Sequence, residues 1–229
     1  MTLGASVQRA LGDGSALIEP LKWLALLLML AEHWMRYVAG DLPPWLFACG
    51  RLAFPLFAFA LALGLRGQSC SKLLRVLPRM LVWAAVAQVT IQFVDAPEDR
   101  LNVLFTFAFG LAAAYGVACI GSPLLVAILL GAIGSVSLWC EFGLVGVAFV
   151  AACVALARAG DRSAAAWVAV LVLLALLAVP NGNHFALAAV PLTFLVARLP
   201  MRVPRLRGAF YWAYALQFPV YAGARALLQ

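Results

Sequence analysis

Charged residues are scarce in this chain. Only 11% of its 229 residues are Asp, Glu, Lys or Arg, whereas 66% are hydrophobic, and the mean hydropathy is +1.02. Soluble domains carry roughly 25% charged and about 45–50% apolar residues, so the composition excludes a soluble protein. No stretch reads as a separate soluble domain or as a long linker. We therefore expect an all-α, polytopic integral membrane protein whose residues 1–229 form one domain.

Signatures of metal and nucleic-acid chemistry are also missing. The five cysteines include no CxxC spacing and no pairing with histidine, so we expect no metal site and interpret them as small apolar packing residues. The net charge of +7 comes without a face of basic and aromatic residues, which argues against a nucleic-acid partner. The cysteines are Cys49, Cys70, Cys119, Cys140 and Cys153.

The apolar stretches predict about nine transmembrane helices. The first is long enough to cross a bilayer and is followed by others, which does not fit a cleavable signal peptide. Breaks rich in Gly, Pro and charge separate the stretches. The first two expected spans are 17–39 and 45–65, and a third follows a basic loop and ends near 94. The fourth runs from 101 to about 120, the fifth from about 123 to 138, and the sixth from about 143 to 158. The seventh ends at 180, the eighth is 184–199, and the ninth follows the linker 200–207.

The loops differ in charge. With nine spans, alternate loops place basic residues on one side and acidic residues on the other, with Arg100 as the main exception. Because Lys and Arg are enriched in cytoplasmic loops, we expect a cytoplasmic N-terminus and an external C-terminus. The basic residues are Arg66, Lys72, Arg75, Arg79, Arg158, Arg162, Arg198, Arg202, Arg205 and Arg207, and the acidic ones are Asp41, Asp95, Glu98, Asp99 and Glu141.

Two polar residues share a depth in the first two spans. His33 lies six residues before the outer end of the first span, and Arg51 six residues after the outer start of the second. A rise of 1.5 Å per residue places both about 9 Å below the outer surface. Asn102 opens the fourth span from that side, Glu141 the sixth, and His184 the eighth. We therefore predict a polar chamber on the outer side, and an intramembrane arginine is by default a functional-site hypothesis.

Structural roles could also explain these residues. Arg51 could extend towards the interface, and Glu32 could pair with Arg36 four residues later on the same helix face. Asn102 could cap a helix or bond a neighbouring helix. Solvation alone could explain Glu141 and His184, and an aromatic belt could explain Tyr211, Trp212 and Tyr214.

The His33 and Arg51 pair suits two kinds of chemistry. Histidine is the usual general base near neutral pH, and a carboxylate from Glu32 or Glu141 would orient it. A fixed arginine could stabilise the oxyanion of acyl transfer. A proton or substrate path through a transporter uses the same residue types, so the residues alone leave the two alternatives open.

Several segments, taken in order, resemble the TraX family. Residues 21–33 end in Glu32-His33, where that family has an acidic residue followed by histidine, usually aspartate. Residues 50–59, which contain Arg51 and Pro55, match its most distinctive segment. Weaker likenesses follow at 102–111, 141–146 and 210–214. Residues 214–217 read Tyr-Ala-Leu-Gln where the family commonly has Tyr-Pro-Leu-His, and Gln217 thus replaces its histidine.

The resemblance implies a bacterial inner-membrane acyltransferase that uses acetyl-CoA. TraX proteins are known for N-terminal acetylation of F-type pilin, and in related transmembrane acyltransferases the donor enters from the cytoplasm. His33 would be the catalytic histidine, with Glu32, Arg51, Asn102 and Glu141 in the same site. The candidates for coenzyme A binding are Arg75, Arg79, Arg202, Arg205, Tyr211 and Tyr214.

The acceptor would be a protein N-terminus, a glycan or a small molecule on the far side of the membrane. Membrane lipid is the other expected partner, and the sequence leaves the oligomeric state open, a homo-oligomer included. A small transporter lined by His33 and Arg51 and a non-catalytic family member are the alternatives.

Overall fold

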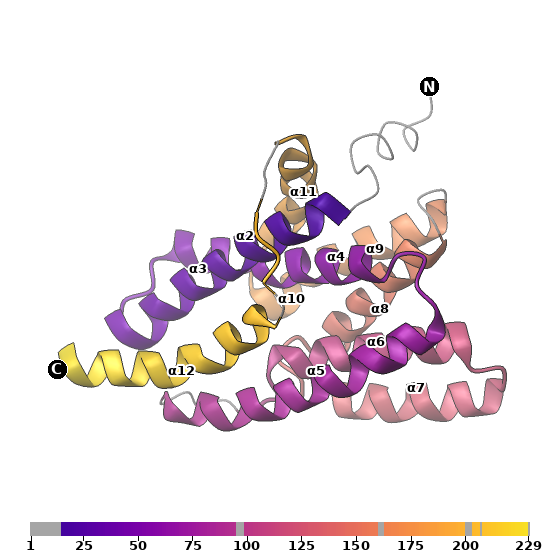
Figure 1. The fold of residues 1–229 in the computed structure, drawn as a ribbon, viewed down its shortest axis with the longest axis horizontal. Coiled ribbons are helices and arrows are strands. Elements are labelled where there is room, and N and C mark those ends of the chain that lie inside the picture. The colour runs from indigo at the N-terminus through magenta and orange to yellow at the C-terminus, as the bar shows by residue number, and fades with distance from the viewer. Residues whose placement is uncertain (1–14, 95–98, 160–162, 200–202, 207, 229) are drawn as a thin grey trace.

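The fold is that of a computed structural model, which describes residues 15–94, 99–159, 163–199, 203–206 and 208–228. The described residues are helical apart from short connections and one isolated bridge between Leu101 and Cys140. Figure 1 shows most of the long helices, among them α5, α7 and α12, lying along one long axis, with α11 set across it. The helices are α2 (Ser15–Trp34), η1 (Met35–Ala39), α3 (Pro44–Gly50), α4 (Ala53–Leu65), α5 (Cys70–Thr90), η2 (Ile91–Phe93), α6 (Val103–Cys119), α7 (Pro123–Ser137), α8 (Gly143–Ala159), α9 (Ala164–Leu176), α10 (Ala178–Asn181), η3 (Phe185–Ala188), α11 (Ala189–Arg198) and α12 (Ala209–Leu228).

Each expected span falls on one helix or on two consecutive helices. The second span is broken into α3 and α4, and the seventh into α9 and α10. The helical segments Pro44–Leu65, Cys70–Phe93 and Ala164–Asn181 are long and apolar enough to cross a membrane. Several other apolar helices in the described part of the chain are shorter than the ~20 residues of a full crossing. The protein is a helical membrane protein, and the count of nine spans stays a prediction.

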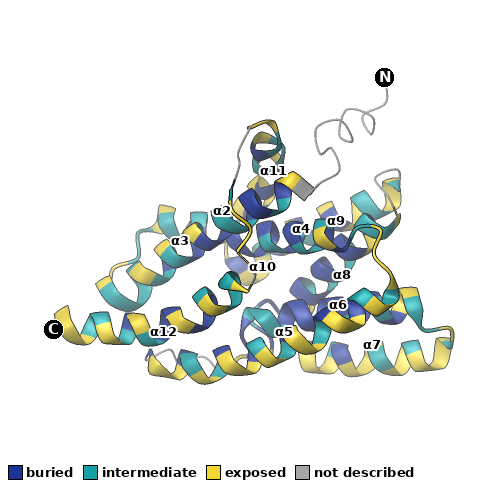
Figure 2. Cartoon of the chain, viewed as in Figure 1, coloured by how far each residue is buried: buried dark blue, intermediate teal, exposed yellow. Residues whose placement is uncertain are grey.

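The outer faces of several helices are apolar. On α7 the exposed residues include Leu124 and Ile128, with exposed fractions of 70% and 60%, and Figure 2 shows exposed positions along that helix and along α5. Burying such surface is favourable by about 25 cal/mol per Å². Lipid tails provide that burial, so these faces fit contact with a bilayer.

The helix α4 lies between two hydrophobic clusters. Phe54, Ala58 and Leu65 pack with α5, α6, α8 and α9, whereas Leu56 and Ala60 pack with α2, α11 and α12. A helix that is apolar on all sides is a buried helix. The segment that contains Arg51 is therefore central to the fold, because it leads directly into α4.

Two expectations are corrected here. The residues Lys72, Arg75 and Arg79 were expected in a loop, but they lie on α5, which begins at Cys70. Cys70 and Cys119 form a disulfide, with 6.0 Å between their Cα atoms, so they are not free packing residues. The antiparallel helices α5 and α6 bring the two cysteines to one end of the bundle, and a separation of 49 residues in the sequence gives no sign of this.

Candidate functional site

The site begins at a break in the helix that precedes α4. The backbone N–H of Arg51 bonds the carbonyls of Phe47 and Ala48 at the end of α3, and α4 starts at Ala53. Pro55 has no N–H to offer the carbonyl of Arg51, and its ring clashes with a helical carbonyl four residues earlier. The proline thus explains why the chain bends at Arg51.

Glu32 on α2 is the centre of the site. Its side chain is buried, and the residue has an exposed fraction of 1%. Its Oε1 accepts hydrogen bonds from Arg36 Nε at 3.1 Å, from Arg36 Nη2 and from Arg51 Nη2 at 3.1 Å. The expected pair with Arg36 is therefore present and is joined by Arg51. A buried carboxylate is costly unless it is paired, and two guanidinium groups supply that pairing.

His33 has a polar neighbour at each ring nitrogen. Its Nε2 lies 3.3 Å from Glu32 Oε2, and its Nδ1 lies 3.0 Å from Gln217 Oε1 on α12. The ring of Phe218 lies 5.9 Å away between centroids, and that of Tyr37 5.6 Å away. Of the two carboxylates expected to orient His33, Glu32 is the one that contacts it.

Arg51 is bound within the site. Besides its bond to Glu32, its guanidinium lies 4.6 Å from the centroid of the Phe47 ring, and 14% of its side chain is exposed. Its Nε is buried and has no hydrogen-bond partner among the described residues. Extension towards the interface does not describe this side chain, because its guanidinium bonds Glu32.

One cavity of about 960 Å³ connects this site with a distant basic group of residues. Glu19 and His33 both line it from α2, and 14 residues of helix correspond to about 21 Å. Of the residues expected in one chamber, His33, Arg51 and Glu141 line this cavity, whereas Asn102 and His184 are not among its lining residues. The cations at the other end, which we call the basic end, are Lys22, Arg66, Lys72, Arg79 and Arg205.

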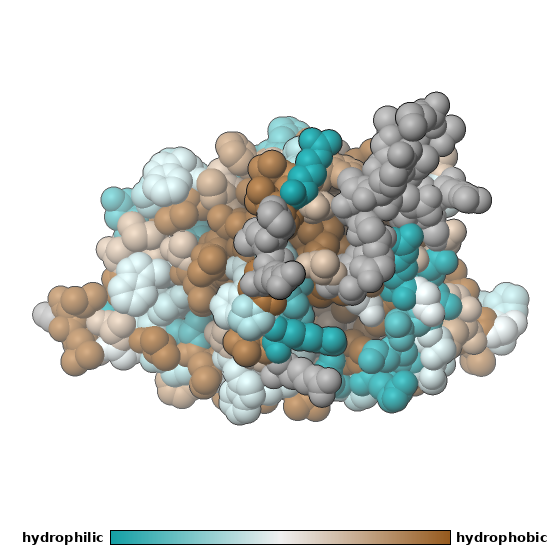
Figure 3. All heavy atoms as spheres, turned by 45° about the horizontal axis from the view of Figure 1, so that its top comes forward, coloured by the Kyte–Doolittle hydropathy of each residue, from teal (hydrophilic) through white to brown (hydrophobic). Residues whose placement is uncertain are grey.

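The basic end is drawn together by ion pairs and ring contacts. Glu19 Oε1 lies 2.8 Å from Lys22 Nζ and 3.9 Å from Arg205 Nε. The Arg79 guanidinium lies 5.6 Å from the Tyr211 ring centroid. Five cations against one acid leave this end positive, which suits a ligand with several phosphates. Figure 3 shows hydrophilic surface gathered in the middle and towards one side of one face, while hydrophobic surface covers much of the rest.

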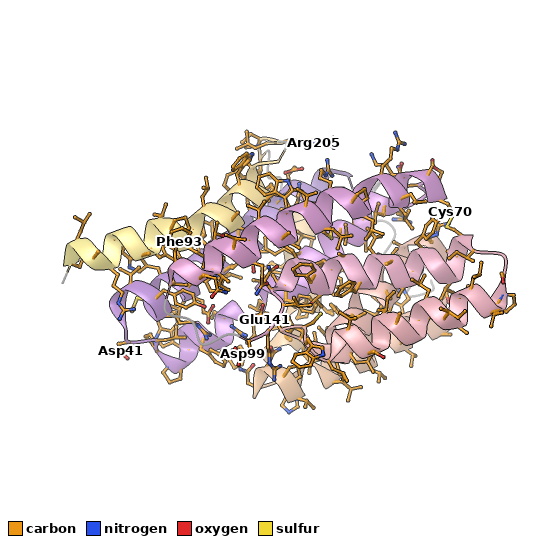
Figure 4. All side chains as sticks on the ribbon, turned by 90° about the horizontal axis from the view of Figure 1, so that it is seen from below. Asp41, Cys70, Phe93, Asp99, Glu141 and Arg205 are labelled. Carbon is orange, nitrogen blue, oxygen red and sulfur yellow. A yellow bond between two sulfur atoms is a disulfide. The ribbon has the colours of Figure 1, made fainter. Side chains whose placement is uncertain are left out.

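Most of the expected site residues line the cavity. In Figure 4, Glu141 is labelled near the middle of the view, Asp41 near one end and Cys70 near the other. The backbone N–H of Glu141 bonds the carbonyl of Leu101 at 3.0 Å. The expected residues that line the cavity are Glu32, His33, Arg51, Arg79, Glu141, Arg205, Tyr211 and Tyr214.

Other expected residues lie elsewhere. Arg75 is exposed, bonds the carbonyl of Ser71 and is not among the lining residues of the cavity. His184 is likewise exposed and not among the lining residues. Arg202 lies outside the described residues, as do Asp95, Glu98, Arg162 and Arg207.

Asn102 is fully buried and bonds the helices rather than the cavity. Its Nδ2 donates to the carbonyl of Ala84 at 2.8 Å and to Gln88 Oε1 at 2.9 Å, and its Oδ1 accepts from the N–H of Leu104 at 3.0 Å. Asn102 thus caps α6 and ties it to α5, which is the structural alternative considered for it. Its amide has no hydrogen left to donate to a substrate.

Several residues at the site and in the cavity lining have no role in the sequence-based expectations. Gln217 was noted only as a departure from a motif, yet it contacts His33 directly. A lone glutamine within the apolar α12 was the available signal. Lys22 and Glu19 line the cavity, and neither of them was assigned a role from the sequence.

Comparison with known proteins agrees with the motifs. The family described as TraX protein matches residues 18–225. Protein TraX of Escherichia coli (strain K12) is 33% identical over 145 residues, which are 62% of this chain and 57% of that relative. The matched part thus spans a little over half the length of the curated relative. No solved structure matches this chain.

Proposed function

Because this chain belongs to the TraX family, we propose that it is a membrane-embedded acetyltransferase. Acetyl-CoA binds with its phosphates at the basic end, and the acetyl thioester reaches along the cavity to His33. The acceptor amine or hydroxyl approaches from the opposite side of the bacterial inner membrane, which the chain crosses several times. A pilin N-terminus is the acceptor that the family suggests, and a glycan or a small molecule fits the same chemistry.

The observation that carries the proposal is the continuity of the cavity. It joins a cluster of cations to a buried Glu32–His33–Arg51 group about 21 Å away along α2. Its volume of about 960 Å³ is at the upper end of the ~300–1,000 Å³ typical of ligand sites. A donor with a charged nucleotide and a long arm that ends in a reactive thioester matches that shape and charge.

The residues act in sequence during transfer. The lone pair of the acceptor amine or hydroxyl attacks the thioester carbon while His33 Nε2 takes the acceptor's proton. Glu32 Oε2 stabilises the imidazolium that forms. The guanidinium of Arg51, a residue that lines the cavity, stabilises the oxyanion of the tetrahedral intermediate. The intermediate then collapses, the carbon–sulfur bond breaks, and the leaving thiolate takes the proton from His33. The products are the acetylated acceptor and free coenzyme A.

The test is acetyl-CoA binding and turnover by the purified protein in nanodiscs. Calorimetry with the wild type should detect binding, and free coenzyme A should appear once an acceptor peptide or amine is added. The His33→Ala variant should still bind acetyl-CoA but release coenzyme A at least about 10²-fold more slowly. The matched control is His184→Ala, because His184 is exposed and lies outside the cavity lining.

Each outcome separates the alternatives. Full transfer by folded His33→Ala would contradict the assignment of His33. Binding without turnover by the wild type, whatever acceptor is supplied, would favour a non-catalytic family member. Absence of acetyl-CoA binding would favour a transporter with His33 and Arg51 on its path.

A further inference from the structure

Gln217 connects α12 to the catalytic histidine. It lies among apolar residues of that helix, with an exposed fraction of 4%. Its Nε2 donates to the carbonyl of Tyr214 at 3.0 Å, and its Oε1 lies 3.0 Å from His33 Nδ1. Both ends of the buried amide thus have partners.

The amide orientation decides which nitrogen of His33 carries a proton. An amide nitrogen can only donate, and an amide oxygen can only accept. The opposite orientation would set Gln217 Oε1 against the Tyr214 carbonyl, with two acceptors facing each other. Since Oε1 therefore faces His33, the ring must present Nδ1–H to it.

A second acceptor competes for the same proton. Glu32 Oε2 lies 3.3 Å from His33 Nε2, an ion-pair distance, whereas Gln217 Oε1 is closer to Nδ1, at 3.0 Å, and is hydrogen-bonded to it. A neutral imidazole has only one N–H. Without an acceptor at Gln217, that proton would move to Nε2 and donate to Glu32. The remaining lone pair would then be on Nδ1, which faces α12.

We infer that Gln217 is a positioning residue that holds neutral His33 in the Nδ1–H tautomer and so keeps the lone pair on Nε2. The tautomer follows from the contacts themselves, whereas its use as a base rests on the proposed function. With Nδ1 occupied by Gln217, Nε2 is the nitrogen that can take a proton from an acceptor and then share it with Glu32.

The docking of α12 does not depend on this one bond. Tyr221 donates from its hydroxyl to the carbonyl of Leu30 at 2.9 Å. The rings of Trp34 and Tyr221 lie 5.7 Å apart between centroids. Substitution of Gln217 by methionine, which has a similar length and no amide, should therefore leave α12 packed against α2.

The sequence makes a direct spectroscopic test feasible. The chain has two histidines, so the His184→Asn variant leaves His33 as the single histidine. In that background, ¹⁵N-histidine NMR in nanodiscs reports the protonation of each ring nitrogen across a pH titration. We expect Nδ1–H with an unprotonated Nε2 in the neutral ring. Gln217→Met should invert this pattern.

Several results would overturn the inference. These are an Nε2–H tautomer while Gln217 is present, an unchanged tautomer in folded Gln217→Met, or a ring that keeps both protons throughout the titration. In an assay of acetyl transfer, Gln217→Met should lower kcat on the order of 10²-fold and leave the KM for acetyl-CoA unchanged. If the tautomers behave as expected and the parent protein transfers no acetyl group, the proposed function fails and the role of Gln217 in setting the tautomer stands.

Discussion

Gly50 lies directly against the side chain of Glu32. A Cβ added at Gly50 would come within 2.6 Å of Glu32 Cγ and 2.8 Å of Glu32 Cβ, distances that real Cβ atoms essentially never show. The absence of a side chain at Gly50 is therefore what allows α3 to approach α2 at the level of the buried carboxylate. Arg51, the next residue, reaches Glu32 because of this approach.

The first prediction concerns this contact. Gly50→Ala should push α3 away from α2 and lower the free energy of unfolding by about 1–3 kcal/mol, as overpacking does. It should also reduce acetyl transfer, because Arg51 and Glu32 would separate. Thermal unfolding in detergent and coenzyme A release measure the two effects.

The matched control for Gly50 is Gly64 on α4. A Cβ at Gly64 would meet only Ile18 Cδ1, at 4.0 Å, so Gly64→Ala should be close to neutral. If Gly50→Ala proves as stable and active as Gly64→Ala, the close approach of α2 and α3 does not matter for the site.

The second prediction separates charge from geometry at Arg51. Arg51→Lys keeps one positive charge for Glu32 but loses the planar guanidinium that lies over Phe47 and its several N–H donors. We expect a folded protein with turnover reduced by about 10²–10³-fold, the usual effect of removing an oxyanion donor. The comparison is with Arg75→Lys, which changes an exposed arginine outside the cavity lining and should retain full turnover. Equal turnover in the two variants would remove Arg51 from the mechanism.

The sequence predicted the level of a residue along the helices better than the direction in which its side chain points. Counting residues from the loops placed His33 and Arg51 at one level, and in the structure both contact Glu32. Hydropathy also located the helical segments, because a long apolar stretch is a property of the chain alone. Adjacent helical residues point about 100° apart, so the contact between Glu32 and His33 could not be foreseen from their positions.

The side-chain contacts that the sequence could not show depend on how each helix is rotated about its axis and on which helices pack together. Whether Asn102 faced the cavity depended on how α6 sits against α5, and its amide turned out to bond Ala84 and Gln88. Gln217 is 184 residues from His33 in the sequence, and no local pattern joins two such distant residues. The disulfide between Cys70 and Cys119 was missed for the same reason.

The third prediction concerns the donor. Arg79 lines the cavity beside Tyr211, whereas Arg75, one turn earlier on α5, is exposed and outside the cavity lining. Arg79→Gln should weaken coenzyme A binding about tenfold, which corresponds to about 1.4 kcal/mol, and a second change at Lys72 should weaken it further. Calorimetry at two salt concentrations should show a smaller salt dependence in these variants. Arg75→Gln should leave the affinity unchanged, and an equal loss from both arginines would show that only general positive charge matters.

The fourth prediction concerns the orientation of the basic end. Arg158 Nη1 donates to the carbonyl of Gln68 at 2.8 Å, so two of the basic segments meet at the end that also carries the Cys70–Cys119 disulfide. Basic loops favour the cytoplasm, whereas disulfides persist mainly in oxidising compartments. The basic residues thus favour a cytoplasmic location for this end of the molecule, and the disulfide favours an external one. Entry of acetyl-CoA from the cytoplasm requires the cytoplasmic location. We therefore expect the Cys70–Cys119 disulfide of the structure to be reduced to two thiols in growing cells.

A membrane-impermeant maleimide decides between the two orientations. In a Cys49→Ser background, whose remaining free cysteines Cys140 and Cys153 are buried, inside-out vesicles should label at Cys70 and Cys119 and spheroplasts should not. The control is Asp41→Cys, combined with Cys49→Ser, Cys70→Ser and Cys119→Ser, because Asp41 is exposed beyond η1 and should label in spheroplasts. Labelling of Cys70 in spheroplasts after treatment with a reductant would place the basic end outside. Cytoplasmic acetyl-CoA would then face the end of the cavity with fewer cations, and the direction of transfer proposed for this protein would be wrong.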